Sequence, residues 1–183
     1  MAWASGLRLY AVLFAAGLLG RLHTIDLPSS LQVLQHPVVL AVSGLMFAIE
    51  FFADKIPGVD SLWDAIHTFI RIPAGAVLAA LALGNHDPAM VLAAALLGGS
   101  LAAGTHAAKA GSRALINASP EPFSNIGASL TEDALVAGGL YAAFAHPWLF
   151  IAFLAAFIVL LAWLLPKLWR GVRMVFSRIA KAR

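Results

Sequence analysis

The chain has 183 residues, of which 61% are apolar and only 11% are charged, and it carries a formal net charge of +3 and no cysteine. Soluble domains average about 45–50% apolar and about 25% charged residues, so the composition excludes an ordinary soluble domain and indicates an integral membrane protein. The lack of cysteine excludes disulfides, thiolate metal sites and cysteine nucleophiles.

Six apolar segments approach the length of about 20 residues that a helix needs to cross the hydrocarbon core of a bilayer. In chain order they are residues 3–22, 38–54, 62–83, 89–108, 134–146 and 148–165. No signal-peptide cleavage sequence follows the first segment, so we interpret it as an uncleaved span. We predict an all-α, polytopic membrane domain over residues 1–166 and a basic cytoplasmic tail over residues 167–183.

Similar turns precede the second, fourth and sixth segments, at His36-Pro37, His86-Asp87-Pro88 and His146-Pro147. Proline is tolerated in the first turn of a helix, so each turn predicts a helix start. The six spans would then form three hairpins in the same orientation, although similar composition alone could produce this match. The three histidines are expected to cap turns; the alternative is that they converge on zinc or copper.

The basic residues predict the orientation of the domain. Of the twelve Lys and Arg residues, only Arg21 falls on the side of the predicted hairpin tips. Basic residues of short loops remain in the cytoplasm, so both termini are expected there. The basic tail is expected to bind anionic lipids, and this distribution argues against a nucleic-acid partner. Five tryptophans near the predicted helix ends suggest an aromatic belt: Trp3, Trp63, Trp148, Trp163 and Trp169.

A first set of polar residues surrounds a predicted helix break at residues 55–58, on the cytoplasmic side. Glu50 and Asp54 are four residues apart and share a helix face before the break. After it, Ser61 and Asp64 have the spacing of a capping box. Four residues then recur at helical spacing along one face: Asp60, Asp64, His67 and Arg71.

A second polar set follows the fourth segment at the same kind of spacing: His106, Lys109, Arg113 and Asn117. Because polar groups inside a membrane pair with one another or line water, we expect Lys109 and Arg113 to pair with carboxylates of the first set. The next segment holds Pro120 and Pro122 and is predicted to be a loop, and Glu121 within it joins the candidate residues. Ser129 and Glu132 have capping-box spacing, so Glu132 and Asp133 are expected to begin the fifth helix.

Three interpretations of these polar residues remain open. They could form a salt-bridged cap that orients helices and does no chemistry. They could line a path for an ion or polar solute, since broken helices at membrane depth usually border a cavity. Asp60, Asp64 and His67 could also bind a divalent metal in an enzyme, but that spacing is a weak signal. No cofactor can be named from the sequence.

Two stretches resemble the signature blocks of a known family. They are EFFADKIPGVDSLWDAIHTFIRIPAGA at residues 50–76 and HAAKAGSRALINASPEPFSN at residues 106–125. The chain resembles, over nearly its whole length except the tail, the bacterial membrane family catalogued as domain of unknown function 4126. The resemblance implies a bacterial inner-membrane protein. It supplies no catalytic residues because the family has no assigned reaction.

The leading hypothesis is transport of a small ion or polar solute. Glu50, Asp54, Asp60, Asp64 and His67 would bind a cation or relay protons, and Lys109 and Arg113 would act as counter-charges or as anion ligands. The alternative is a non-transporting membrane scaffold or accessory subunit, and a metal-dependent enzyme acting on lipid head groups is the third. Small-residue helix faces, such as Ala94-xxx-Gly98, are expected to pack helices and to favour a homo-oligomer.

Overall fold

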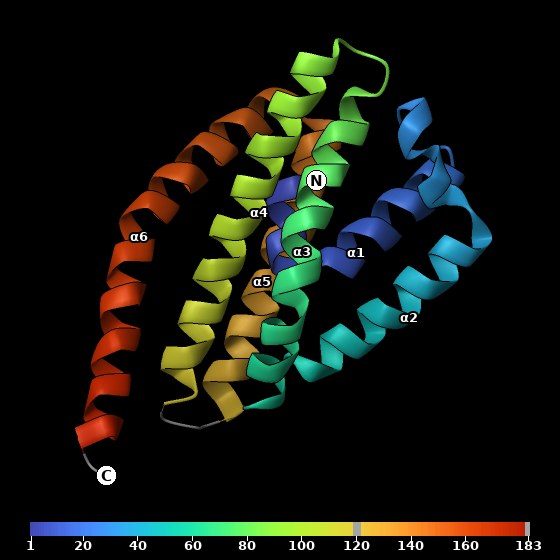
Figure 1. Ribbon diagram of the computed structural model, residues 1–183. Helices are drawn as coiled ribbons and strands as arrows, with labels where there is room; N and C mark the ends of the chain where they lie inside the picture. The colour runs from blue at the N-terminus through green and yellow to red at the C-terminus, as the bar shows by residue number, and fades with distance from the viewer. Residues whose placement is uncertain (119–121, 182–183) are drawn as a thin grey trace.

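A computed structural model of the chain describes residues 1–118 and 122–181, and all regular structure in these ranges is helical (Figure 1). The elements in chain order are α1 (Ala2–Arg21), the short 3-10 helix η1 (Ser29–Gln35), α2 (Pro37–Ala53), α3 (Val59–Leu83), α4 (Pro88–Ile116), α5 (Pro122–Ala145) and α6 (Pro147–Lys181). The prediction of an all-α fold is confirmed.

Four of the described helices are long and apolar enough to cross a membrane: α1, α3, α4 and α6. The pair of η1 and α2, bent by 67°, could form one further broken span. Within the described ranges α5 does not meet the same criterion, because its first half carries several polar residues. The structure therefore supports a multi-pass membrane protein, whereas six spans in three hairpins remain a prediction.

The α3–α4 pair forms the centre of the bundle, and small residues allow these two helices to lie close together (Figure 1). A Cβ atom added at Gly98 would lie 2.7 Å from the backbone oxygen of Gly75. Close approach through small residues is how helices associate in lipid, where hydrophobicity gives no driving force between them. The predicted packing role is confirmed for Gly98.

Helix α1 is interrupted at Arg8, whose backbone angles of φ −142° and ψ 76° are not helical. The part before Arg8 runs beside α4, with Ala2 next to Gly98. The part after Arg8 leaves α4 and packs along α2, where Phe14 lies against Gly44. The N-terminus therefore lies part of the way along the bundle (Figure 1), and nothing in the sequence indicated the interruption at Arg8.

Trp3 lies in the hydrophobic core, and its place in an aromatic belt is therefore excluded. Its side chain is 2% exposed and packs edge-on against Phe153 and Phe157 of α6, with ring centroids 5.4 and 5.5 Å apart. Because the interrupted α1 starts inside the bundle, its first tryptophan is covered. Trp148 and Trp169, in contrast, are 85% and 71% exposed, as a belt requires.

The α2–α3 connection turns at Gly58, whose φ of 84° lies in the region that favours glycine. The carboxylate of Asp60 accepts hydrogen bonds from the backbone N–H groups of Gly58 and Ser61. Asp60 thus satisfies the N–H groups at the start of α3, and the capping box predicted from Ser61 and Asp64 is wrong. The predicted helix break itself is present.

Helix α5 begins at Pro122, about twelve residues earlier than expected, and carries Glu132 and Asp133 in its interior. These acidic residues do not begin the helix, so the capping-box interpretation of Ser129 and Glu132 is wrong. Pro122 is compatible with this start because proline fits the first helical turn. The His36 side chain caps α2 by accepting from Val38 N, as predicted for that turn.

The close α3–α4 contact predicts that Gly98→Ala destabilises the protein. The added methyl group meets the backbone of Gly75, so we expect a loss of about 1–3 kcal/mol in the free energy of unfolding. Thermal unfolding in detergent would measure it. Gly104→Ala is the matched control on the same helix, because a Cβ there meets only Leu161, at an ordinary contact distance of 3.7 Å. Equal unfolding temperatures of the two variants would contradict the role of Gly98.

Candidate functional site

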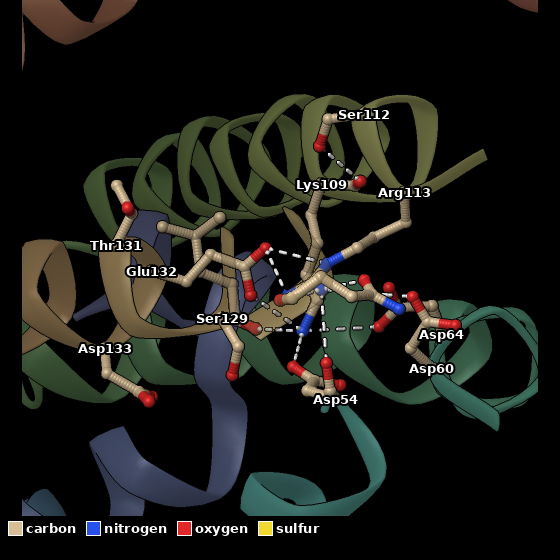
Figure 2. Close-up of polar contacts among 12 residues, drawn as sticks. Asp54, Asp60, Asp64, Lys109, Ser112, Arg113, Ser129, Thr131, Glu132 and Asp133 are labelled. Atoms are coloured by element: carbon tan, nitrogen blue, oxygen red, sulfur yellow. Dashed lines mark hydrogen bonds and ion pairs between the residues drawn. The ribbon is translucent and has the colours of Figure 1, made fainter. Parts of the chain in front are cut away.

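Charged side chains from α1 to α5 converge beside the break in α1 and form one buried cluster, which we call the charged network (Figure 2). Nine charged residues of the network are no more than 8% exposed: Arg8, Glu50, Asp54, Asp60, Asp64, Arg71, Lys109, Arg113 and Glu132. Ionised groups are strongly destabilising in a low-dielectric interior unless they are paired. Their pairing therefore decides how these helices can pack.

Asp54, the residue that ends α2, lies at the centre of the network. Its Oδ2 atom is 2.5 Å from Arg8 Nη1 and 2.5 Å from Lys109 Nζ. Burial alone would raise the pKa of this carboxyl group, but the two cations outweigh burial and hold the pKa below its ordinary value. This carboxylate thus joins the break in α1 to the end of α2 and the middle of α4.

Arg71 makes a second bridge, from α3 to α2. Its Nη2 atom donates to Glu50 Oε1 at 2.6 Å, and its Nη1 atom donates to Asp64 Oδ1 at 2.7 Å. His106 Nδ1 of α4 lies 3.3 Å from the same Nη1. One guanidinium therefore serves two carboxylates. The planar fork of arginine suits this geometry.

Arg113 and Asn117 fix the C-terminal end of α4. Arg113 Nη2 donates to Glu132 Oε1 at 3.1 Å, and its Nη1 donates to the backbone oxygen of Asp54 at 3.1 Å. Asn117 Nδ2 donates to Asp60 Oδ1 at 2.9 Å. Arg113 lies 4.0 Å from Asp60, so the asparagine is the closer partner of this carboxylate.

Helix α5 contributes four further members, of which Asn125 is fully buried and accepts from Arg113 Nη1 through its backbone oxygen at 2.9 Å. Ser129 Oγ accepts from Arg8 Nη2 at 2.8 Å, and Asp133 Oδ1 lies 2.9 Å from Arg8 Nε. Glu132 Oε2 lies 3.4 Å from Lys109 Nζ. These contacts explain why α5 is polar in its first half. Its acidic side chains complete the pairing of cations on α1 and α4.

The two histidines of the predicted stripes lie at the edge of the network. His67 Nδ1 is 2.8 Å from the backbone oxygen of Trp63, and its Nε2 is 3.1 Å from Tyr10 Oη. His106 Nε2 is 2.6 Å from Thr68 Oγ1. Both nitrogens of His67 therefore have partners.

The structure does not support the metal site considered for Asp60, Asp64 and His67. Their polar atoms contact Asn117, Arg71 and Tyr10 respectively, and do not converge on one point. Among residues 1–118 and 122–181, no three His, Asp or Glu side chains are arranged to hold a metal ion. Helical spacing places these three residues on one face of α3, but each side chain contacts a different neighbouring residue.

The buried charges of the described residues do not balance. Five buried carboxylates, of Glu50, Asp54, Asp60, Asp64 and Glu132, face four buried cations, of Arg8, Arg71, Lys109 and Arg113. At the edge, the half-buried Lys55 and Asp133 pair at 3.9 Å and leave this difference unchanged. The network thus has one carboxylate more than its cations can neutralise.

Two crevices lead to the network from opposite sides of α5. The first, of about 340 Å³, lies between α1, α2 and α5; Phe14 and Phe47 line it, and Arg8 and Asp133 lie at its charged end. The second, of about 310 Å³, lies between α4, α5 and α6 and reaches Lys109 and Glu132. Helix α5 therefore separates two apolar crevices, and charged residues of the network line the inner end of each.

Most of the residues predicted from the two stripes meet in this network. The predicted pairing is confirmed for Lys109 with Asp54 and Asp64, at 2.5 and 3.5 Å. Glu50, Asp60, Arg71, Arg113 and Asn117 also belong to it. Glu121 lies outside the described residues. Whether these residues bind a substrate remains a prediction.

The sequence interpretation missed Arg8, Asn125, Ser129, Glu132 and Asp133. Arg8 was counted as a loop charge, although it lies within the first apolar segment and Arg21 is the only other charge there. Asn125, Ser129 and Glu132 fall at 0, +4 and +7, so they form a third stripe at helical spacing. The adjacent prolines concealed it by predicting a loop.

The burial of four basic residues also changes the argument for orientation. Arg8, Arg71, Lys109 and Arg113 are inside the network and cannot count as charges of cytoplasmic loops. The expectation of a cytoplasmic C-terminus now depends on the tail, where Lys167 and other basic side chains are exposed.

The comparisons with known proteins identify a family and nothing closer. The family model described as "Domain of unknown function (DUF4126)" matches residues 1–167, which includes every described member of the network. No curated protein and no solved structure matches the chain. The match confirms the resemblance stated from the two signature blocks, while a bacterial origin remains an expectation.

The lowered pKa of Asp54 predicts a specific loss of stability in acid. A depressed pKa in the folded state stabilises the protein above the ordinary value of 3.8, and this contribution disappears as the pH falls through the folded-state pKa. Asp54→Asn should lower the free energy of unfolding by about 3–5 kcal/mol near neutral pH, because it leaves buried cations poorly paired.

Unfolding in detergent, followed by tryptophan fluorescence, would measure this difference between about pH 7 and about pH 2. The gap between wild type and Asp54→Asn should shrink on acidification. Asp87→Asn is the control, because Asp87 is an exposed cap of α4 and asparagine also caps helices. A gap that is independent of pH would contradict the role of Asp54.

Proposed function

Because the chain belongs to the family described as domain of unknown function (DUF4126), whose description names no activity, we propose a function from the charged network. We propose that this multi-pass membrane protein transports a small ion or polar solute, and that the network is the place where the transported species is bound. The single observation that carries the proposal is an unbalanced set of buried charges at a helix break, reached by two crevices.

The energetic cost of buried charges favours a functional role for the network over a purely structural one. Replacing a buried ion pair by well-packed apolar residues is often neutral or stabilising, so nine buried charges are not needed to hold helices together. Charged residues inside membrane proteins usually mark substrate or ion pathways. The break at Arg8 adds the second hallmark, since interrupted helices in transporters expose backbone groups near the bound species.

The residues have distinct roles in this proposal. Glu50 and Asp64, which share one guanidinium, bind a cation or a proton. Lys109 and Arg113 are counter-charges that hold the carboxylates in place. Helix α5 lies between the crevices, so a small displacement of its acidic side chains from Arg8 and Lys109 would open the network to one crevice or the other.

A membrane scaffold or accessory subunit is the second candidate, and one observation favours it. Each buried cation of the network has a carboxylate partner within 4 Å, as a structural lock requires. The structure identifies the pair that tests it, because Lys109 is closer to Asp54 than to Asp64. In a lock, Asp54→Lys combined with Lys109→Asp should restore much of the stability that each single change removes.

The cellular setting is part of the proposal. Lys167, Arg170 and Arg173 are exposed on α6 beyond the apolar part of that helix, which supports a cytoplasmic C-terminus bound to anionic lipids. We place the protein in the bacterial inner membrane, as the family resemblance implied. Exposed small residues on α5, such as Gly138, support association into a homo-oligomer.

Flux through purified protein in liposomes would test transport. Dyes inside the vesicles that respond to pH or to metal ions would report the entry of each ion in a panel. Asp64→Asn should abolish flux while the protein remains folded, because asparagine has a similar shape and because Arg71 and Lys109 keep their closer carboxylate partners, Glu50 and Asp54. The expected loss is at least about tenfold, equivalent to about 1.4 kcal/mol.

Asp87→Asn is again the matched control and should transport at the wild-type rate, since Asp87 is exposed and lies outside the network. If folded wild-type protein moves no ion of the panel and no polar solute, the transport function is wrong. The scaffold function would then be tested by the charge-swapped pair and by identifying proteins that co-purify.

A further inference from the structure

The carboxylates of the network differ in how well they are neutralised. Asp54 has two cations at 2.5 Å. Glu132 has three cations within 4 Å, at 3.1, 3.4 and 3.8 Å. Each of these two carboxylates therefore has more than one positive charge beside it.

Asp60 and Asp64 also have partners that offset their negative charges. Asp64 has Arg71 at 2.7 Å and Lys109 at 3.5 Å. Asp60 lacks a close cation, but it accepts from the amide of Asn117 and from two backbone N–H groups at the start of α3. The N-terminus of a helix attracts negative charge, so the start of α3 compensates for the missing cation beside Asp60.

Glu50 is the exception within the network. Its closest cation is Arg71, and Arg71 also serves Asp64. Only Oε1 accepts a hydrogen bond; Oε2 is buried without a hydrogen-bond partner, and the whole residue is 0% exposed. One oxygen each of Asp54, Asp64 and Glu132 also lacks such a partner, but each of these carboxylates has at least two cations within 4 Å, whereas Glu50 has one. An unpaired oxygen of an ionised carboxylate is costly in such a place, whereas a protonated acid carries no charge there.

The residues around Glu50 supply no second cation to its carboxylate. Arg8 of α1 directs Nη1 to the backbone oxygen of Glu50 at 3.5 Å, not to its carboxylate. Arg8 and Lys109 approach the neighbouring Asp54 instead, and Asp54 adds a second negative charge on α2. The other titratable groups around this position are Tyr10 of α1, Asp64 and Arg71 of α3, and His106 of α4; η1 contains no charged residue.

We propose that Glu50 is the protonation site of the network: its carboxyl group is a neutral acid in the resting protein and carries the one proton that balances the buried charges. The proton sits on Oε2, and Oε1 continues to accept from Arg71. Loss of this proton leaves the network with one uncompensated negative charge, which a cation can neutralise. The inference rests on the proposed function only for the idea that this exchange accompanies transport.

Infrared spectroscopy of the purified protein tests the site without any transport assay. A protonated carboxylic acid has a carbonyl band that ionised carboxylates lack. Wild type should show one such band from a buried acid at neutral pH, and Glu50→Gln should lose it. Glu50→Asp keeps an acid at this position and should retain the band at a shifted frequency. Asp87→Asn should leave the band unchanged.

Stability provides the second measurement. Glutamine has the shape and charge of a neutral glutamic acid, so Glu50→Gln should unfold close to the wild-type temperature, whereas Asp54→Asn should unfold well below it. A wild type without the band, or a band that persists in Glu50→Gln, would overturn the assignment. Failure of flux with the band intact would instead count against transport and leave the protonation site standing.

Discussion

The structure depends on the Asp54 carboxylate and the two cations that it holds, Arg8 and Lys109. This triad explains the interruption of α1, because Arg8 must leave the helical path for its side chain to reach Asp54, Ser129 and Asp133. It also explains the end of α2, whose last turn delivers Asp54 to the same point. Once these groups are buried together, no helix can slide or rotate without unpairing a charge in a low-dielectric interior.

Rigid and adaptable parts of the bundle are therefore distinct. The α3–α4 pair is held by close backbone approach at Gly75 and Gly98 and by the Arg71 bridge. Helix α5 has crevices on two sides; its first half is joined to the bundle through polar side chains, and its second half packs Val136 and Leu140 into the core around Trp3. Coupling a charge change in the network to a movement of α5 needs only that its ion pairs compete with a bound cation or proton.

The predictions from the sequence succeeded where helical spacing alone decides the outcome. Asp60, Asp64, His67 and Arg71 do share a buried face of α3, and His106, Lys109 and Arg113 share one of α4. The predictions failed where the same local pattern is compatible with two structural roles. Arg8 had the sequence signature of an orientation signal, and Glu132 that of a helix start, yet both complete the network. Local patterns cannot distinguish these roles, because the partners are more than 100 residues apart along the chain for Arg8 and Ser129.

The sequence by itself determined the class of the protein, because apolar composition and segment length report directly on the bilayer as a solvent. It also determined the family, the helix break near Gly58 and two of the polar stripes. Only the tertiary structure decided that α1 is interrupted, that α5 supplies a third stripe and that the carboxylates outnumber their cations. The physical reason is that burial and pairing are properties of several helices together, and the charge that each group can keep depends on neighbours that the local sequence does not specify.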